Sequence, residues 1–130
     1  MFFPFAFSRI CGSELSALHA RRAELTHAGA EVLALSCDAV HTLRAYAEAL
    51  AGEEELGFRL LSDFWPHGSI ARSFGVFDER RGAPERATFV VDHGSILRHV
   101  QHVPAGEARD LDEMLTVLRD LGKTTQKSTL

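Results

Sequence analysis

Apolar positions recur at helical spacing along three segments of the chain. The first segment follows Cys11 and ends before Gly29, with leucines at helical intervals among Ala, Glu and Arg, which favour helices. The second runs from Val40 to Leu50, with Asp38 as its expected N-cap. The third places four leucines on one helix face, and these are Leu111, Leu115, Leu118 and Leu121. The pattern therefore predicts three amphipathic helices.

Short runs between these segments have the pattern of β-strands. Residues 31–36 form an apolar run typical of a buried strand, and residues 58–61 form a shorter one. Residues 87–91 and 96–103 flank the turn sequence Asp-His-Gly-Ser, which predicts an antiparallel hairpin. Residues 68–74 fit one or two helical turns. The order of these elements predicts an α/β, thioredoxin-like fold, a mixed sheet with helices on both faces.

Length and composition fit a single domain. The chain has 130 residues, of which 45% are hydrophobic and 25% charged, as in ordinary globular domains. Gly122 follows the last leucine of the third helix and is a typical residue just beyond a helix end. We therefore expect one domain over residues 1–122 and a disordered tail over residues 123–130.

Charge and hydropathy exclude several classes of partner. The net charge is −4 without a basic run, which argues against binding nucleic acid or an anionic membrane surface. The apolar start is interrupted by Pro4 and lacks the leading positive charge of a signal peptide, and no run reaches the length of a membrane helix. Two cysteines without a disulfide framework indicate a reducing compartment, so we expect a cytoplasmic protein.

Cys11 is the strongest candidate for chemistry. It follows Ser8 by three residues and lies where the first helix begins, so unpaired N–H groups and the positive end of the helix dipole favour its thiolate. A lone cysteine is more often an inert buried residue. The surrounding residues favour the reactive interpretation instead.

The segment Pro4-Phe5-Ala6-Phe7-Ser8-Arg9-Ile10-Cys11 contains the pattern Pro-x-x-x-Ser-x-x-Cys. This pattern resembles the active-site motif of the peroxiredoxins, with Ser8 where that family more often has Thr. Residues 61–68 (LSDFWPHG) and 86–92 (RATFVVD) are similar to the one-cysteine, alkyl hydroperoxide reductase E-type branch of the AhpC/TSA-like, thioredoxin-like superfamily. The resemblance extends from Met1 to about Leu121.

The resemblance also implies that the chain is short at its start. Peroxiredoxins usually carry an N-terminal β-hairpin and most of a central strand before the Phe-Phe-Pro segment, and here almost nothing precedes it. We expect a mis-assigned or truncated start that leaves the neighbourhood of Phe2 and Phe3 unpaired and a sheet edge exposed. Whether such a shortened chain folds alone is a question that the sequence leaves open.

The resemblance assigns roles to five residues. It makes Cys11 the peroxidatic cysteine, Ser8 a hydrogen-bond donor to the thiolate and the peroxide, and Pro4 a shield of the sulfenate from water. Arg86 supplies positive charge beside the thiolate, although an arginine on its own more often forms a surface ion pair. Glu14 has a supporting role, the orientation of an arginine. Serine at position 8 keeps the hydroxyl but lacks the methyl group that restricts rotation, which predicts a reduced rate.

Cys37 follows a predicted strand and is expected to be a buried structural thiol. The alternative is a resolving cysteine, which requires the Cα atoms of the two cysteines to lie within about 7 Å. No cysteine lies in the C-terminal segment or five residues after Cys11, so one-cysteine chemistry with an external thiol reductant follows. The E-type resemblance implies a low-molecular-weight thiol or a redoxin, such as mycothiol and mycoredoxin.

A metal or another cofactor is not expected. The nearest histidines, His99 and His102, lie three apart on a predicted strand and point to opposite faces. The sequence contains no His-x-x-x-His or Cys-x-x-Cys motif. We expect His67, which follows Trp-Pro, to be structural. The catalytic set therefore consists of side chains alone.

These observations predict a cytoplasmic thiol peroxidase that reduces hydrogen peroxide, alkyl hydroperoxides or peroxynitrite through Cys11. The E-type resemblance also implies a homodimer, with loops 5–9 and 65–68 as the contact region. One alternative is a truncated, weakly active or inactive thioredoxin-like domain that acts as a redox sensor or binding module through the same cysteine. A second alternative, a disulfide oxidoreductase, requires another cysteine close to Cys11, and Gly12-Ser13-Glu14 supplies none.

Overall fold

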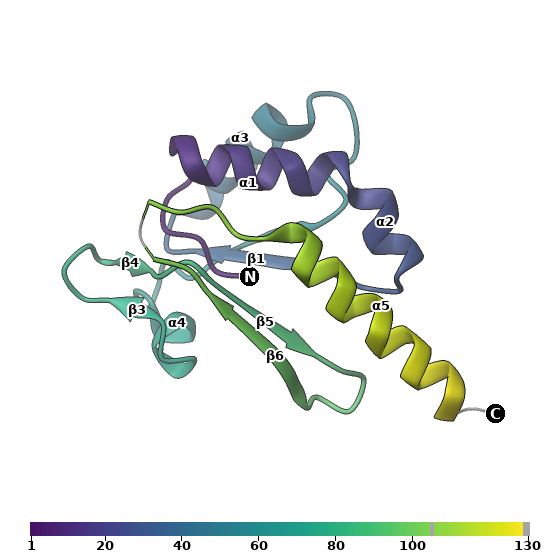
Figure 1. The fold of residues 1–130 in the computed structure, drawn as a ribbon. Helices are drawn as coiled ribbons and strands as arrows, with labels where there is room; N and C mark the ends of the chain where they lie inside the picture. Colours follow the sequence, from purple (N-terminus) through teal and green to yellow (C-terminus); the bar gives the residue numbers. More distant parts are fainter. Residues whose placement is uncertain (105, 129–130) are drawn as a thin grey trace.

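The computed structural model describes residues 1–104 and 106–128, with side chains as far as Gly122. Its main sheet contains two strand pairs (Figure 1). Strand β1 (Leu33–Ser36) is parallel to β2 (Arg59–Ser62), and β5 (Ala87–Val91) is antiparallel to β6 (Leu97–His102). Phe2 lies between the pairs, parallel to β1 and antiparallel to β5. The predicted mixed sheet and its hairpin are confirmed.

The first three residues occupy the centre of this sheet. The Phe2 N–H donates to the Ala87 carbonyl at 2.7 Å, and the Phe3 N–H donates to the Leu35 carbonyl at 3.0 Å. The Leu35 N–H donates in turn to the Met1 carbonyl at 2.8 Å. The prediction that Phe2 and Phe3 are unpaired is therefore wrong, because these residues connect the two halves of the sheet.

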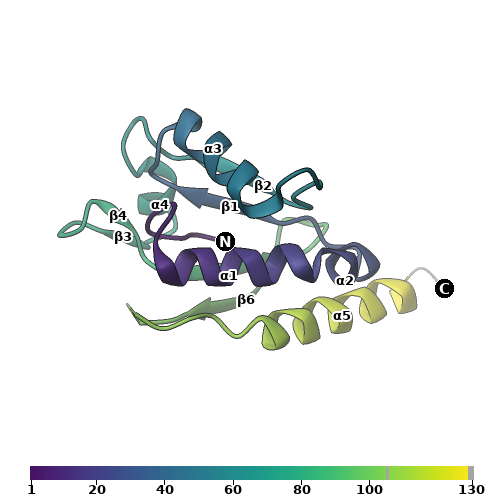
Figure 2. The same ribbon diagram turned by 90° about the horizontal axis from the view of Figure 1, so that it is seen from above.

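Helices cover both faces of the sheet, as predicted. The long helices α1 (Arg9–Ala20), α3 (Val40–Ala51) and α5 (Leu111–Ser128) share one face, where α1 lies between the other two when seen from above (Figure 2). The short helix α4 (Ser69–Ser73) covers the opposite face. Between them the sheet is buried on both sides, which requires apolar side chains on both faces of its central strand.

Phe2 and Phe3 supply those side chains, because successive residues of a strand point to opposite faces. The Phe3 side chain is fully buried with the leucines of α1, α3 and α5. The Phe2 ring packs on the other face, with its centroid 5.3 Å from that of Phe74 and 5.9 Å from that of Phe89. Each face of the sheet thus has its own apolar cluster.

Three predicted element boundaries differ from the structure. The first helix is divided at Arg21, where the backbone leaves the helical region, and continues as α2 (Arg22–His27). The N-cap of α3 is Ala39 rather than Asp38, whose carboxylate bonds elsewhere. The last helix continues through Gly122 to Ser128, because a glycine alone does not end a helix that can continue its hydrogen bonds. Most of the predicted tail is therefore helical, and residues 129–130 lie outside the described residues.

A small antiparallel pair, β3 (Phe77–Asp78) with β4 (Ala83–Pro84), was not predicted. Its two-residue strands are too short for a periodic pattern to reveal.

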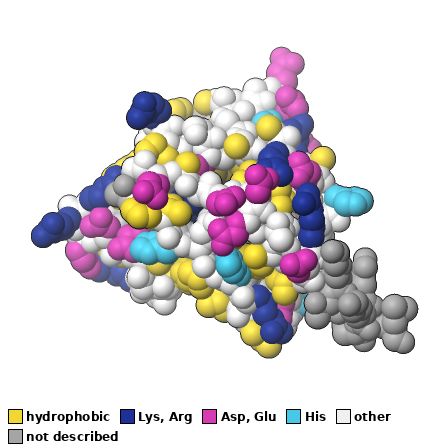
Figure 3. All heavy atoms as spheres, in the orientation of Figure 1, with side chains coloured by type: hydrophobic (Ala, Val, Ile, Leu, Met, Phe, Trp, Pro, Cys, Tyr) yellow, Lys and Arg dark blue, Asp and Glu magenta, His cyan; other side chains and the backbone are white. Residues whose placement is uncertain are grey.

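On the face shown in Figure 3, acidic and basic side chains are interspersed. In the described part of the chain, no helix is long and apolar enough to cross a membrane.

Candidate active site

Cys11 lies in the first turn of α1, as the sequence predicted. Ser8 is the N-cap, and its Oγ accepts a hydrogen bond from the Cys11 N–H at 3.3 Å. The preceding loop is held by Asp38, whose Oδ2 accepts from the Ala6 N–H at 2.9 Å and from the Ser36 hydroxyl at 2.7 Å. The residue expected to cap α3 therefore anchors the loop that leads to the cysteine.

Phe7 fixes the turn between this loop and α1. Its φ of 64° is uncommon for a bulky residue, and its ring centroid lies 4.8 Å from that of Tyr46 on α3. Tyr46 is itself buried, and burial raises its pKa to about 12, with nearby Cys11 acting in the same direction. Tyr46 therefore stays neutral near the cysteine at physiological pH.

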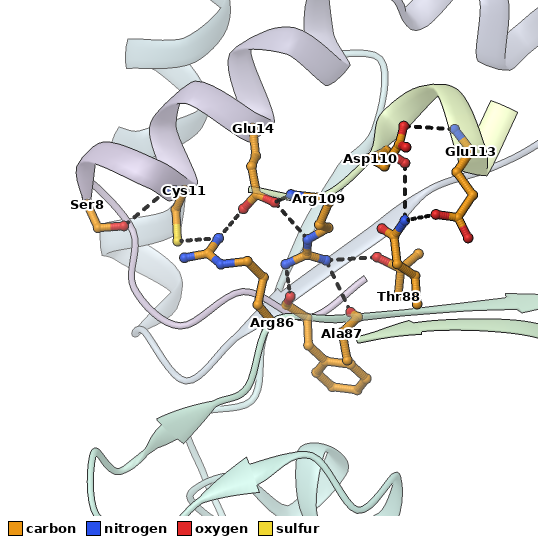
Figure 4. A network of polar contacts seen from close by, with 11 residues as sticks. Ser8, Cys11, Glu14, Arg86, Ala87, Thr88, Arg109, Asp110 and Glu113 are labelled. Atoms are coloured by element: carbon orange, nitrogen blue, oxygen red, sulfur yellow. Dashed lines mark hydrogen bonds and ion pairs between the residues drawn. The ribbon is translucent and has the colours of Figure 1, made fainter. Parts of the chain in front are cut away.

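The sulfur of Cys11 lies beside the guanidinium of Arg86. Arg86 Nη1 is 3.5 Å from Cys11 Sγ, and Arg86 directly precedes β5 (Figure 4). Cys11 is fully buried and Arg86 is only 6% exposed. A peroxide can therefore reach the sulfur only when neighbouring side chains move aside, and it then meets a fixed positive charge in a poorly hydrated site.

Glu14 lies three residues after Cys11 and thus on the same side of α1. Its Oε1 accepts a hydrogen bond from Arg86 Nη1. Its Oε2 accepts from the backbone N–H of Arg109 at 2.8 Å and from Nε of Arg109 at 3.0 Å. The Glu14 side chain is 4% exposed, so a buried carboxylate joins two buried guanidinium groups.

Arg109 is a site residue that sequence reasoning missed. It also donates to the carbonyl of Phe2, to that of Ala87 at 3.1 Å and to Thr88 Oγ1 at 2.9 Å. Burial lowers the pKa of Arg109 below its usual value, and the carboxylate of Glu14 offsets only part of this effect. Nothing in the local sequence distinguishes this arginine, because its partners come from distant segments. Arg109 connects the central strand to Glu14 and through it to Arg86.

The charges of this network favour an anion beside Arg86. Two guanidinium groups and one carboxylate leave a net positive charge in a buried site. A negative charge that develops next to Arg86 Nη1 is therefore stabilised, and little solvent screens the attraction. A cavity of about 160 Å³ on this side of the molecule is lined by Pro4 and Arg86. The structure thus brings all five predicted site residues, Pro4, Ser8, Cys11, Glu14 and Arg86, into one region.

Cys37 is a buried thiol at the end of β1, as predicted. Burial raises its pKa to about 11, and the carboxylates of Asp63 and Asp38 act in the same direction. Its thiol therefore stays protonated at pH 7 to 9. Because an unfolded cysteine ionises at lower pH, this site lowers the stability of the fold progressively from about pH 9 to pH 11.

We expect Cys37 to react slowly with alkylating reagents. In the variant Cys11→Ser, the rate of iodoacetamide modification at pH 8 should be about 100-fold below that of the urea-unfolded variant, because a pKa raised by two units reduces the thiolate fraction by that factor. Intact mass measured over time gives both rates. Equal rates would show that Cys37 is an ordinary accessible thiol.

The histidines considered as metal ligands have separate partners. His99 Nε2 lies 3.1 Å from Glu113 Oε1, whereas His102 Nε2 lies 2.9 Å from Glu85 Oε2. His67 Nε2 lies 2.7 Å from the Gly82 carbonyl, in a position that stabilises the β3–β4 turn. Among the described residues, no group of three or more His, Cys, Asp or Glu side chains is placed to hold a metal ion.

Comparison with known proteins identifies the family. A sequence model of the AhpC/TSA family matches residues 1–100. The chain belongs to the AhpC/TSA family. It is 39% identical over 110 residues to alkyl hydroperoxide reductase E of Mycobacterium tuberculosis, an alignment that covers 85% of this chain and 69% of that protein. It is 36% identical over 123 residues to the probable peroxiredoxin prdx-3 of Caenorhabditis elegans, with 91% and 53% covered.

Solved structures of AhpC/TSA proteins confirm the thioredoxin-like peroxiredoxin fold. AhpC of Enterococcus faecalis superposes with a TM-score of 0.81 at 28% identity, over 96% of this chain and 75% of that one. AhpC of Mycobacterium tuberculosis gives a TM-score of 0.80 at 27% identity, over 95% and 67%. The relatives are named peroxiredoxins and alkyl hydroperoxide reductases, so this family member is a thiol-dependent peroxidase. The comparisons do not favour the alternative of an inactive redox sensor.

Proposed function

We propose that the chain reduces hydrogen peroxide, alkyl hydroperoxides or peroxynitrite with Cys11 as the peroxidatic residue. The observation that carries this proposal is the contact between Cys11 Sγ and Arg86 Nη1 in a buried site at the start of α1. It places a nucleophilic atom beside a donor that can bind a peroxide oxygen. Membership of the AhpC/TSA family supports the same assignment.

In the proposed reaction the Cys11 thiolate attacks one oxygen of the peroxide in line with the O–O bond. The S–O bond forms as the O–O bond breaks, so the cysteine is oxidised to sulfenic acid and the other oxygen leaves as alkoxide, as hydroxide or, from peroxynitrite, within nitrite. An alkoxide or hydroxide takes up a proton to give an alcohol or water. Arg86 and the N–H groups that begin α1 stabilise the negative charge on the leaving oxygen, and the Ser8 hydroxyl aligns the peroxide.

Glu14 and Arg109 hold Arg86 in position for this step. Glu14 uses one oxygen for each arginine, so Arg86 cannot rotate away without losing a buried charge-assisted hydrogen bond. Pro4, which is buried, shields the sulfenic acid from water. In this assignment Glu14 and Arg109 are positioning residues, whereas Cys11, Ser8 and Arg86 contact the reacting atoms.

Regeneration requires an external thiol. A low-molecular-weight thiol or a redoxin, of which mycothiol and mycoredoxin are examples, attacks the sulfenic sulfur to give a mixed disulfide and water, and a second thiol releases Cys11. Cys37 is an unsuitable resolving group because it is buried and its pKa is raised. No prosthetic group takes part in this cycle.

We further propose that the protein is a cytoplasmic homodimer. Exposed aromatic side chains in both expected contact loops support this region, since Phe7 in the loop before α1 is 57% and Trp65 in the loop after β2 is 83% exposed. Large exposed rings stabilise an interface when it removes them from water. Light scattering gives the molar mass of the unaltered chain, which we expect to be that of a dimer, and of Trp65→Ser, which we expect to be lower. The mass of a single chain for both would contradict the dimer.

Two cysteines without a disulfide support the proposed reducing compartment, the cytoplasm.

Trapping of the oxidised cysteine tests the catalytic assignment. We expect one equivalent of hydrogen peroxide, with a sulfenic-acid reagent present, to add one trap mass to the chain at Cys11. The variant Cys37→Ser is the matched control and should give the same adduct. A folded chain without an adduct, or with one at Cys37, would contradict the proposal.

Arg86 should contribute strongly to the rate. We expect Arg86→Gln to lower the second-order rate constant for peroxide by about 100- to 1,000-fold, the usual effect of removing one charge-stabilising donor. The control is Arg98→Gln, which removes an exposed ion pair with Asp92 on the hairpin and should leave the rate unchanged. Stopped-flow measurement of peroxide loss gives both constants. Equal rates in the two variants would remove Arg86 from the mechanism.

A further inference from the structure

The loop of residues 4–8 leads into α1 and carries two residues of the candidate active site. The side chains of Phe5 and Phe7 in this loop are exposed, so the core does not enclose them. Ala6 is partly buried, and its backbone N–H donates to Asp38 Oδ2 at 2.9 Å. The loop is therefore attached to the rest of the fold by a carboxylate that lies 32 positions away in the sequence.

Asp38 is itself fixed at the ends of two strands. Its Oδ2 also accepts from the Ser36 hydroxyl at 2.7 Å, and its backbone N–H donates to Ser36 Oγ at 3.2 Å. Its carbonyl accepts from the Ser62 hydroxyl at 2.6 Å. Ser36 is the last residue of β1 and is fully buried, and Ser62 is the last residue of β2. Asp38 thus connects the loop to the sheet.

The backbone of Phe7 makes this attachment important. Its φ of 64° lies in the left-handed region, which bulky residues rarely adopt and which persists only where surrounding contacts enforce it. The residue before Phe7 is bonded to Asp38, and the residue after it is the N-cap of α1. Without the acceptor on Asp38, Phe7 can relax to an ordinary negative φ, and the chain then enters α1 in another direction.

The residues after this turn belong to the candidate active site. Ser8 Oγ accepts from the Cys11 N–H at 3.3 Å (Figure 4), and the Ser8 carbonyl accepts from the Gly12 N–H at 2.8 Å. A change of direction at Phe7 therefore moves the Ser8 hydroxyl relative to Arg86, which directly precedes β5. Reacting groups must be closely aligned, and a misplacement of about 1 Å can reduce a rate roughly 100-fold.

We propose that Asp38 is a positioning residue for the reaction at Cys11 and acts through the Ala6 N–H and the turn at Phe7 on the Ser8 hydroxyl. The inference rests on the proposed function, in which Ser8 aligns the peroxide that Cys11 attacks. The role of Asp38 is to supply a hydrogen-bond acceptor in a fixed place. An uncharged side chain with an oxygen at that place should therefore serve as well.

Peroxide kinetics test this role. We expect Asp38→Ala to lower the second-order rate constant for hydrogen peroxide by about 10- to 100-fold, the scale on which misplaced groups act. Asp38→Asn should retain most of the rate, because its amide oxygen can accept from both Ala6 and Ser36. The matched control is Asp92→Ala, which removes a carboxylate that accepts from two backbone N–H groups beside the β5–β6 turn and should leave the rate unchanged.

Tyr46 reports the position of the loop without any peroxide. It is the only tyrosine of the chain, so carbon-13 labelling of tyrosine rings gives NMR signals from this residue alone. Its ring centroid lies 4.8 Å from that of Phe7, close enough for the Phe7 ring current to shift these signals. We expect Asp38→Ala to move them toward their positions in Phe7→Leu, which lacks the ring. Asp38→Asn and Asp92→Ala should leave them unchanged.

A second substitution applies if Asp38→Ala does not fold, which circular dichroism shows. Asp38→Ser keeps a polar side chain, but this side chain is one atom shorter and its hydroxyl falls short of the Ala6 N–H. We expect the same loss of rate and the same movement of the Tyr46 signals as for Asp38→Ala.

Four results would overturn the proposal. Equal rate constants for the unaltered chain and folded Asp38→Ala would show that the attachment does not serve the reaction. Equal losses in Asp38→Asn and Asp38→Ala would show that the charge acts rather than the hydrogen bond. Unchanged Tyr46 signals in folded Asp38→Ala would show that the loop keeps its position without Asp38. An unaltered chain that forms no sulfenic acid at Cys11 would contradict the proposed function itself, whereas the first three results concern Asp38 alone.

Discussion

Cys11→Ser should abolish peroxide reduction. The hydroxyl of serine has nearly the size of the thiol but is not ionised at neutral pH and cannot form a sulfenic acid, so no covalent step remains. We expect the second-order rate constant for hydrogen peroxide to fall by about 10⁴-fold or more, the scale on which removal of a nucleophile acts in enzymes. Competition against a peroxide-sensitive dye, with a dithiol as reductant, measures this constant.

The variant should remain folded, because Cys11 is buried in a site that serine can fill, although its hydroxyl forms fewer apolar contacts. Cys37→Ser is the matched control, since it removes the other buried thiol, and it should retain the activity of the unaltered chain. Activity that survives in Cys11→Ser and is lost in Cys37→Ser would transfer the peroxidatic role to Cys37.

Glu14→Gln should have the largest effect on stability. The substitution leaves Arg86 and Arg109 buried without their shared carboxylate. Removing one partner of a buried ion pair costs about 3 to 5 kcal/mol, a large part of the stability of an ordinary domain. We expect the free energy of unfolding to fall by about 3 kcal/mol in urea titrations and the peroxide rate to fall with it, because Arg86 is no longer held.

Two further variants separate this effect from a general loss of charge. Glu24→Gln removes a carboxylate that pairs with Arg21 and Arg119 at the surface, where solvent screens the interaction, and should change stability little. Glu14→Gln combined with Arg86→Met should destabilise less than the sum of the single changes, because each removes the partner of the other. Additive effects would show that the two side chains act independently.

Local patterns in the sequence were sufficient to predict most of the elements. The spacing of apolar residues predicted α3 and the core of α5, and the Asp-His-Gly-Ser turn predicted the β5–β6 hairpin, since helix and turn preferences depend on neighbouring residues. Boundaries were less predictable. The interruption at Arg21 has no glycine or proline to mark it, and Gly122 did not end α5.

Some residues of the candidate site could likewise be predicted from their sequence neighbours, and others could not. Ser8 is the N-cap of α1, and Cys11 and Glu14 lie in its first two turns, so the sequence alone brought them close together and supported the family resemblance. Arg86 was identified through that resemblance rather than from its own surroundings. The role of Asp38 was mistaken, because a carboxylate before a helix usually caps that helix, whereas here it accepts from the Ala6 N–H and the Ser36 hydroxyl.

The sequence by itself determined the thioredoxin-like order of elements and the position of a cysteine at a helix start, because both depend on contacts between near neighbours. Only the tertiary structure revealed that Arg109 contacts Glu14 from 95 positions away and that Phe2 and Phe3 are paired. Such contacts arise when distant segments pack together, and a buried charge finds its partner through that packing rather than through its sequence neighbours.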